Sequence, residues 1–204
     1  MKYLVLLFLL TSCGYNKDHR PLLLVIGDSI SIGYSPHLVS LLPEYRIEHN
    51  NGNAQNSTKT LQHIDQWLAD RPSVIVWNNG NWDAREPTSY VGDSPQFVAN
   101  SLQDYQANIV AIAQKMVTTG AMVYFVTTTN TIQGNPLYID GRAESQNQIA
   151  KTVLPQLGVT IIDLHEFQLP NTNWFISPND VHFTDYGNKQ NAIFIANKIK
   201  SLTL

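Results

Sequence analysis

The sequence has little charge, a single cysteine and no long hydrophobic run, and each shortage excludes a class of protein. Charged residues make up 14% of the 204 residues. Lys and Arg form no cluster, so neither a nucleic-acid-binding face nor a polybasic membrane patch is expected. One cysteine excludes an intramolecular disulfide framework and a cysteine-based zinc site. No run reaches 18 apolar residues, so no membrane-spanning helix is expected.

What remains is the composition of one globular domain. Hydrophobic residues make up 43% of the chain, which is enough for a real core, and the net charge is only −3. A length of 204 residues favours one domain, and the sequence contains no repeat and no internal linker.

The first twenty residues differ from the rest and are typical of an export signal. Lys2 is followed by eight apolar residues, 3–10, and the stretch ends in Leu-Thr-Ser-Cys at 10–13. This ending resembles the lipobox of bacterial lipoproteins, in which the signal is cleaved before a cysteine that is then lipidated. We therefore expect a signal peptide at 1–12, a lipidated Cys13, a tether at 13–20 and a protein anchored in the cell envelope, facing the periplasm or the exterior. The alternative is an ordinary secretory signal with an incidental cysteine.

Residues 21–204 alternate between strand-like and helix-like segments, which predicts a single α/β domain. Apolar or β-branched runs predict strands at 22–26, 46–49, 73–77, 121–127 and 159–162. Helical spacing predicts helices at 58–70, 97–119, 141–157 and 184–201, and a fifth after Gly33 with Pro36 in its first turn. Five strands alternating with five helices predict a parallel sheet covered on both faces. The longest irregular stretch, 83–96, follows the third strand, where ligand-binding loops lie in such folds.

Ser29 stands at the end of the first strand, in Gly27-Asp28-Ser29, and has two interpretations. It is a helix cap, or it is a nucleophile whose oxyanion is held by backbone N–H groups at a helix N-terminus. The residues alone favour the cap. The segment lacks the G-x-S-x-G pattern of the α/β-hydrolases, because Ser31 replaces the last glycine.

Asp180 and His182 near the other end of the chain favour catalysis. They stand two residues apart on a polar turn before the last helix. A carboxylate that holds an imidazole in one tautomer is the orienting half of a catalytic triad. The alternative is that Asp180 or Thr184 merely caps that helix, and the two interpretations are compatible.

Four segments in order then resemble the SGNH (GDSL-type) hydrolases. They are Gly27-Asp28-Ser29, the Asn/Gly turn at 50–53, the Asn/Gly turn at 78–83 and the C-terminal Asp-x-His. The resemblance covers residues 21–204. It implies a three-layer α/β/α flavodoxin-like sandwich, in agreement with the five-stranded parallel sheet predicted above, and ester hydrolysis through an acyl-serine intermediate without a metal or organic cofactor.

Carried over by position, the resemblance makes Ser29 the nucleophile and His182 the general base. The orienting acid departs from the pattern, because the family reads Asp-x-x-His and Asn179 occupies the place of that Asp. Asp180 is the nearest carboxylate, so we expect Asp180 to orient His182, with Asn179 as the alternative.

The expected oxyanion hole combines the Ser29 N–H, the turn at Gly52 and Asn53, and one asparagine of the third turn. That turn reads Asn78-Asn79-Gly80-Asn81-Trp82-Asp83, whereas the family pattern is Gly-x-Asn-Asp. Trp82 falls where the oxyanion asparagine stands. The turn resembles a branch with the pattern Asn-x-Gly-x-His/Trp-Asp, in which Asn78 is our candidate donor and Asn81 the alternative.

A lipoprotein of this family is expected to remove small acyl groups, above all acetyl, from extracellular carbohydrate. Trp82, Tyr90 and Trp174 lie near predicted strand ends and could bind substrate, with ordinary packing as the alternative; we single out Trp82. A lysophospholipase or other lipid esterase is the second function, and a catalytically impaired glycan-binding protein on the same fold is the third. A receiver-like or phosphatase domain is disfavoured because Asp28 has no second acid beside it.

Overall fold

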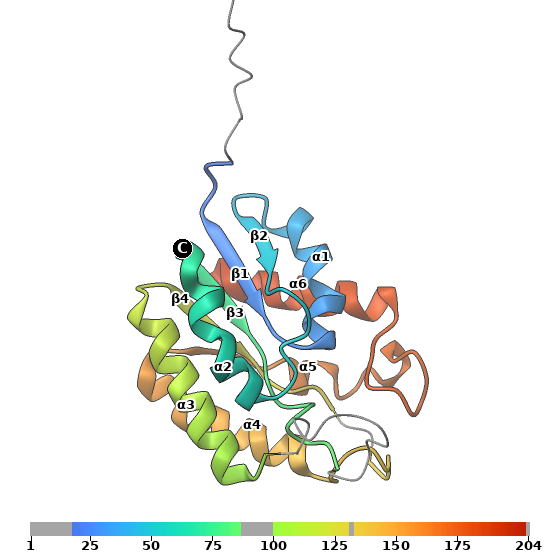
Figure 1. The fold of residues 1–204 in the computed structure, drawn as a ribbon. Coiled ribbons are helices and arrows are strands. Elements are labelled where there is room, and N and C mark those ends of the chain that lie inside the picture. Colours follow the sequence, from blue (N-terminus) through green and yellow to red (C-terminus); the bar gives the residue numbers. More distant parts are fainter. Residues whose placement is uncertain (1–17, 87–99, 131–132, 203–204) are drawn as a thin grey trace, which may run out of the picture.

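The computed structural model describes residues 18–86, 100–130 and 133–202, and it is built around one parallel sheet (Figure 1). The five strands are β1 (Leu22–Ile26), β2 (Arg46–His49), β3 (Val74–Trp77), β4 (Met122–Val126) and β5 (Thr160–Ile162). All neighbouring pairs are parallel, and their spatial order is β2-β1-β3-β4-β5. The order reverses at β1, so the end of β1 lies at the topological switch point where such sheets place their ligands.

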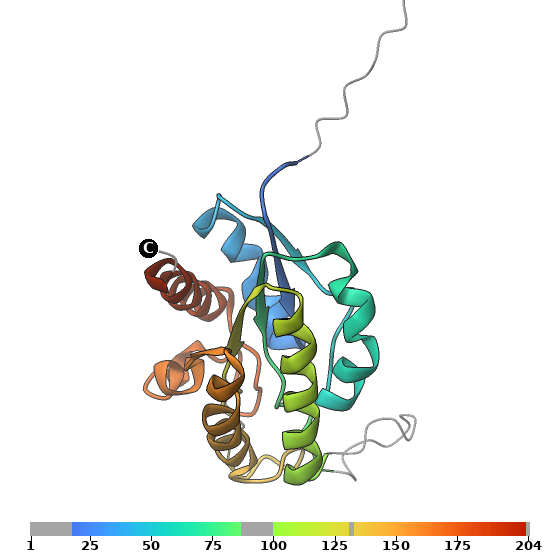
Figure 2. The ribbon, with the colours of Figure 1, turned by 90° about the vertical axis from the view of Figure 1, so that its left-hand side faces the viewer.

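Helices cover both faces of this sheet (Figure 2). One face carries α1 (Ser29–Leu41), the short α5 (Leu164–Gln168) and α6 (Asp185–Leu202). The other carries α2 (Ser57–Trp67), α3 (Leu102–Thr118) and α4 (Arg142–Val153). The domain therefore has three layers, α/β/α.

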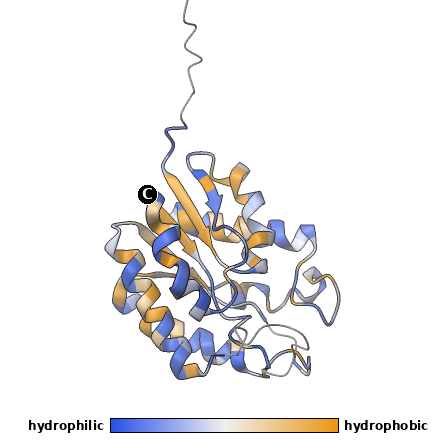
Figure 3. Ribbon diagram, viewed as in Figure 1, coloured by the Kyte–Doolittle hydropathy of each residue, from blue (hydrophilic) through white to orange (hydrophobic). Residues whose placement is uncertain are grey.

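The core consists of two clusters, one on each side of the sheet. Alternate residues of β1 explain the division, because Leu23 and Val25 belong to the cluster under α1 and α6, whereas Leu24 and Ile26 belong to the one under α2 and α3. Every residue of β1 and β3 is buried, as in a central parallel strand. Figure 3 shows β1 as a continuous hydrophobic strand.

The predicted fold class is confirmed, and the predicted strands differ from the observed ones only at their ends. Several helix predictions need correction. The first helix begins at Ser29, so Pro36 lies inside α1 and the expectation of Pro36 in the first turn is wrong. The five-residue α5 was not predicted, because one turn of helix is too short to show a 3.6-residue period.

Two predicted helices also end in tighter turns. Residues Leu68–Asp70 (η1) and Pro155–Leu157 (η3) are 3-10 helices rather than a continuation of α2 and α4. Pro155 explains the second ending, since a proline cannot donate the backbone hydrogen bond that would extend α4.

Several expectations fall on residues that the structure does not describe. These are the signal peptide at 1–12, Cys13 with most of the tether, Tyr90 and most of the irregular stretch 83–96. Among the described residues, no helix combines the length and hydrophobicity needed to cross a membrane.

Candidate active site

Asp28 and Ser29 connect β1 to α1, and the structure separates their roles. Asp28 is the N-cap of α1, because its Oδ1 accepts a hydrogen bond of 3.0 Å from the Ile30 N–H. Ser29 is the first helical residue and is partly exposed. The capping function therefore belongs to Asp28, and the Ser29 hydroxyl stands at the positive end of the α1 dipole.

A short hairpin before α6 carries the other two predicted residues. Phe175 and Phe183 form an antiparallel bridge, and their rings stack with centroids 4.6 Å apart. On either side of that bridge, Ile176 N–H donates to His182 O (2.9 Å) and Thr184 N–H donates to Trp174 O (2.8 Å). Because Phe183 is buried, the hairpin is anchored to the core and holds Asp180 and His182 over the end of β1.

The structure brings Ser29, His182 and Asp180 together in one chain of contacts. Ser29 Oγ lies 2.8 Å from His182 Nε2, inside the 2.6–3.5 Å expected for a serine and its general base. His182 Nδ1 lies 2.6 Å from Asp180 Oδ1, and the same oxygen accepts the His182 backbone N–H at 2.9 Å. Burial by itself raises the pKa of the Asp180 carboxyl, but its bonds with His182 outweigh that effect and leave the pKa below the ordinary value.

Asn179, the alternative orienting residue, lies elsewhere. Its side chain is exposed, and its backbone carbonyl accepts a 3.0 Å hydrogen bond from Asn135 Nδ2. The contact with His182 Nδ1 is made by Asp180. The bond from the His182 backbone N–H to Asp180 Oδ1 closes a local turn, and this turn places the same carboxylate oxygen against the His182 ring.

The turn after β2 is fastened to the segment that carries Ser29. Asn50 Oδ1 accepts the Gly27 N–H (2.9 Å), Asn50 Nδ2 donates to Gly52 O (3.0 Å), and Ala54 N–H donates to Gly27 O (2.9 Å). Gly52 is exposed with a φ of 72°, a conformation that favours glycine. Asn53 Oδ1 accepts the Gln55 N–H (2.8 Å), which leaves its amide N–H₂ as the possible donor to a ligand.

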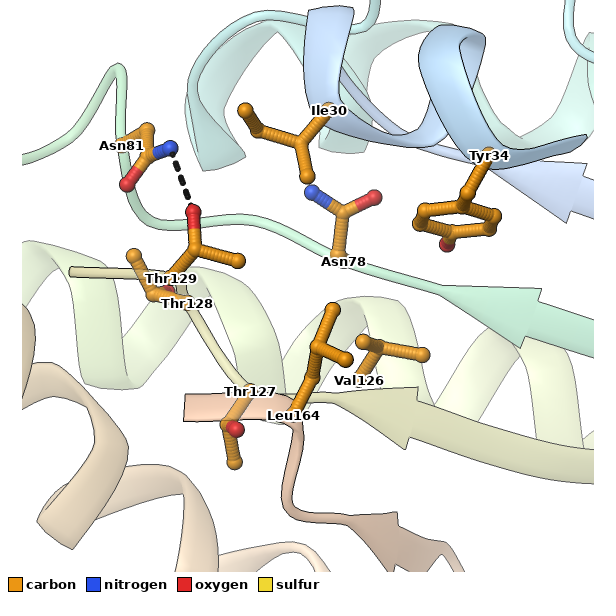
Figure 4. Close-up of a pocket in the computed structure, with 9 residues that line it drawn as sticks. All are labelled: Ile30, Tyr34, Asn78, Asn81, Val126, Thr127, Thr128, Thr129 and Leu164. Carbon is orange, nitrogen blue, oxygen red and sulfur yellow. Dashed lines mark hydrogen bonds between the residues drawn. The ribbon is translucent and has the colours of Figure 1, made fainter. Parts of the chain in front are cut away.

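Asn78 and Asn81, the two candidates from the third turn, have different surroundings (Figure 4). Asn78 lies beside Ile30, and its Nδ2 donates one hydrogen to Asp28 Oδ1 at 3.0 Å. Asn81 is turned toward Thr129, and its Nδ2 donates to Thr129 Oγ1 at 3.2 Å. Asn78 is therefore next to the start of α1, with one hydrogen of its amide left for a ligand, whereas Asn81 points away from it.

Asp28 is a buried carboxyl whose second oxygen has no partner in the described part of the chain. Burial raises the pKa of Asp28, and the hydrogen bonds from Asn78 and from the Ile30 N–H offset this only in part. Gly27 leaves room for this arrangement, since a Cβ at Gly27 would lie 1.9 Å from Asn78 Oδ1. Asp28, Asn78 and Gly27 thus lock β1, β3 and the start of α1 together beneath Ser29.

Asp83, the last residue of the third turn, has a structural role. Its carboxylate accepts hydrogen bonds from the Ser57 N–H (3.0 Å), Ser57 Oγ (2.6 Å) and Asn100 Nδ2 (2.6 Å). It therefore joins the third turn to the start of α2 and to the segment before α3. Because Asp83 is buried, its pKa is raised to about 6.

We expect the Asp83→Asn substitution to remove a pH dependence of stability. A folded-state pKa of about 6 above an ordinary value of 3.8 means that the stabilisation is complete below pH 3.8 and is lost as pH rises through 6. At 1.36 kcal/mol per pKa unit, the free energy of unfolding of the wild type should fall by about 2 kcal/mol relative to that of the variant between pH 4 and pH 7. Urea unfolding at several pH values measures this. Asp65→Asn, which alters an exposed carboxylate paired with Lys115, should show no such trend, and a parallel trend in both variants would contradict the assignment.

The two described aromatic candidates, Trp82 and Trp174, differ in burial and in the side chains they contact. Trp82 is half-buried, and the Arg85 guanidinium lies over its ring at 4.5 Å from the centroid. Trp174 is buried against Phe167 and Tyr186, so its role is packing. The described residues hold no group of three or more His, Cys, Asp or Glu side chains arranged to bind a metal ion.

Sequence reasoning missed Asn100 and a second serine–histidine pair. Ser31 Oγ lies 2.7 Å from His49 Nε2, but Ser31 is completely buried, so no substrate reaches it. No local pattern marks either feature. Asn100 and Asp83 are 17 positions apart, and Ser31 and His49 are 18 apart, so only the fold brings them together.

This arrangement is suited to nucleophilic catalysis. A partly exposed hydroxyl faces an imidazole nitrogen, a carboxylate holds the other nitrogen, and the turn after β2 is bonded to Gly27, two residues before the hydroxyl. Such a site can deprotonate the serine, form a covalent acyl intermediate and stabilise a developing oxyanion.

Comparison with known proteins agrees with this geometry. The chain resembles the lipase/acylhydrolase from Enterococcus faecalis at 19% identity and a TM-score of 0.73, covering 89% of this chain and 96% of that one. It also resembles the acetyl xylan esterase AlAXEase (19% identity, TM-score 0.69, covering 90% and 100%) and a variant of Axe2, an acetyl-xylooligosaccharide esterase from Geobacillus Stearmophilus (16%, 0.72, 88% and 94%). At these identities the structures establish the fold alone. No curated protein matches the chain. The sequence model of one family, GDSL-like Lipase/Acylhydrolase, matches residues 23–195, so the chain belongs to this family of ester-cleaving hydrolases.

Proposed function

We propose that the protein is a serine esterase that removes small acyl groups, above all acetyl, from carbohydrate. The observation that carries this proposal is the contact of 2.8 Å between Ser29 Oγ and His182 Nε2, two residues 153 positions apart. Asp180 continues the chain of contacts from the other side of the imidazole. Three residues in this order are the parts that a Ser-His-Asp triad requires.

The proposed reaction has two halves. His182 Nε2 takes the Ser29 proton while Ser29 Oγ attacks the ester carbonyl, and the tetrahedral intermediate collapses to an acyl-serine as His182 protonates the departing alcohol. A water molecule then gives its proton to His182 and attacks the acyl-serine. The second tetrahedral intermediate collapses to the free acid as His182 returns the proton to Ser29 Oγ. Asp180 stabilises the imidazolium formed in each half.

The proposed oxyanion hole consists of the Ser29 N–H, the turn at Gly52 and Asn53, and the Asn78 amide. Asn78 is preferred to Asn81 because it lies beside the start of α1. This choice accompanies the proposal that the third turn belongs to a branch of the family with the pattern Asn-x-Gly-x-His/Trp-Asp. Removal of one such donor typically costs about 10²–10³ in kcat. Trp82 on the same turn remains the candidate for substrate contact.

Two similar structures bear the names of esterases acting on acetylated xylan or xylo-oligosaccharide, which supports an acetylated glycan as substrate. The second candidate is a lysophospholipase or other lipid esterase, favoured by the likeness to a lipase/acylhydrolase. The intact contacts among Ser29, His182 and Asp180 argue against an impaired glycan-binding protein, which would need none of them.

A series of p-nitrophenyl esters tests the proposed function. The purified protein should hydrolyse the acetate faster than the octanoate and decanoate, and a fluorophosphonate should label Ser29 in the wild type but not in Ser29→Ala. Release of acetate from an acetylated oligosaccharide should depend equally on Ser29. A preference for the decanoate would favour the lipid esterase, and absence of any Ser29-dependent turnover would refute the proposed esterase function.

We also propose that Cys13 is the lipidated first residue of the mature protein and anchors it in the cell envelope. The Leu-Thr-Ser-Cys ending of the apolar segment supports this. Mass spectrometry of the protein extracted from its native membrane should find diacylglycerol on Cys13, and Cys13→Ser should release the protein from the membrane fraction. A mature chain that begins beyond Cys13 would contradict the proposal.

A further inference from the structure

A cavity of about 400 Å³ lies beside the hairpin that carries His182, on the side of the segment after β4. Its described walls come from residues 130 and 133 of that segment, from residues 172 and 173 before the hairpin, and from residues 175–178 of the hairpin itself. Asn135 Nδ2 donates to Asn179 O at 3.0 Å and ties the two walls together. The volume falls within the roughly 300–1,000 Å³ that ligand pockets usually have.

The described residues that line this cavity are uncharged. The polar ones include Asn130, Gln133, Thr172 and Asn173, and Phe175 and Ile176 supply apolar surface. Carboxamides and hydroxyls both donate and accept hydrogen bonds, as sugar hydroxyl groups do. A zwitterionic lipid headgroup would call for charged partners, and the described lining residues offer none. The chemistry therefore matches a neutral polyhydroxylated ligand.

The hairpin connects this cavity to the reaction. Ile176 lies next to His182, because the Ile176 N–H donates a hydrogen bond of 2.9 Å to His182 O. Ile176 is 59% exposed, so its side chain is available to a ligand that also reaches His182.

The role of His182 then decides which half of an ester the cavity receives. His182 protonates the leaving oxygen, so the alcohol portion of the substrate must lie on the His182 side of the bond that breaks. The acyl portion lies toward the oxyanion donors, at the turns after β2 and β3. A group that continues past the leaving oxygen along the hairpin passes Ile176 and reaches Asn173.

We propose that this cavity is a subsite for a neutral sugar unit of the alcohol portion of the substrate, bound by Asn173, Asn130 and the surface of Ile176. The proposal rests on the proposed esterase function and specifies its substrate. It makes the cavity a determinant of specificity that favours acetylated saccharides over simple acetate esters.

The experiment compares two substrates, acetylated xylobiose and p-nitrophenyl acetate, in the full-length protein. For Asn173→Ala and Ile176→Glu, the ratio of kcat/KM for the disaccharide to kcat/KM for the simple ester should fall about five- to tenfold, as expected for one lost hydrogen bond or apolar contact. Matched controls are Asn197→Ala on α6 and Val39→Glu on α1, both exposed and far along the chain from the cavity, which should keep the ratio of the wild type.

A binding measurement tests the sugar subsite independently of the proposed esterase function. Xylobiose should bind the Ser29→Ala protein saturably, and Asn173→Ala in that background should weaken binding at least fivefold. If no ester is hydrolysed but this binding and its loss are observed, the esterase fails and the subsite stands. A ratio that does not change, absence of xylobiose binding, or a selective loss of activity on lysophosphatidylcholine would each overturn the subsite.

Discussion

Replacing Ser29 with alanine should lower kcat for ester hydrolysis by roughly 10⁴–10⁶, and His182→Ala should do the same. Ser29 Oγ and His182 Nε2 are 2.8 Å apart, and neither a base without a nucleophile nor a nucleophile without a base completes the reaction. Because the two act as one unit, the double variant should lose little more than either single variant. Steady-state assays with p-nitrophenyl acetate measure kcat for the two single variants and for the double variant.

Ser31→Ala is the matched control for this experiment. Ser31 stands on the same helix and lies 2.7 Å from His49 Nε2, so it forms a serine–histidine pair of nearly the same length. It differs in being completely buried, and its Oγ also donates to Asp28 O at 2.8 Å. We expect the substitution to lower stability while leaving catalysis within about tenfold. If Ser31→Ala abolished turnover and Ser29→Ala did not, the assignment of the nucleophile would be wrong.

The sequence predicted the centre of the sheet well because β1 and β3 are buried on both faces. The five apolar residues of β1 and the four of β3 leave no solvent face, so their hydrophobic runs coincide with the strands. The start of the first helix is harder to predict than the strands. The sequence predicts that this helix begins after Gly33, whereas the Asp28 side chain caps it at Ser29. A cap is a contact between one side chain and one N–H, and several polar residues before the helix could have made it.

The site was predictable where it depends on order along the chain and unpredictable where it depends on packing. Ser29 and His182 could be paired because each stands at the entry to a helix and the sequence of segments matched a family. That Asn78 would give one amide hydrogen to Asp28, and that Asp83 would bind Ser57 and Asn100, follows only from how the turns meet at the ends of the strands. No local pattern carries that information.

The second large effect concerns the orienting acid, Asp180. Its spacing from His182 is two residues, whereas the family pattern has three. Asp180→Ala should lower kcat by about 10²–10⁴, whereas Asn179→Ala should cost little. Asp180 Oδ1 accepts from both the backbone and the ring of His182, so its loss removes the orientation of the imidazole as well as the charge that stabilises the imidazolium. Asn179 is exposed, and its bond with Asn135 uses the backbone carbonyl, which the substitution leaves in place.

Asp180→Asn separates orientation from charge. An asparagine oxygen can still accept both His182 hydrogens, so kcat should fall less than in Asp180→Ala if orientation dominates and equally if charge dominates. The bonds with His182 keep the pKa of Asp180 below its ordinary value, so the carboxylate is ionised throughout the neutral range. If Asn179→Ala proved as damaging as Asp180→Ala, the two residues would act through the shape of the hairpin, and catalysis would rest on Ser29 and His182 alone.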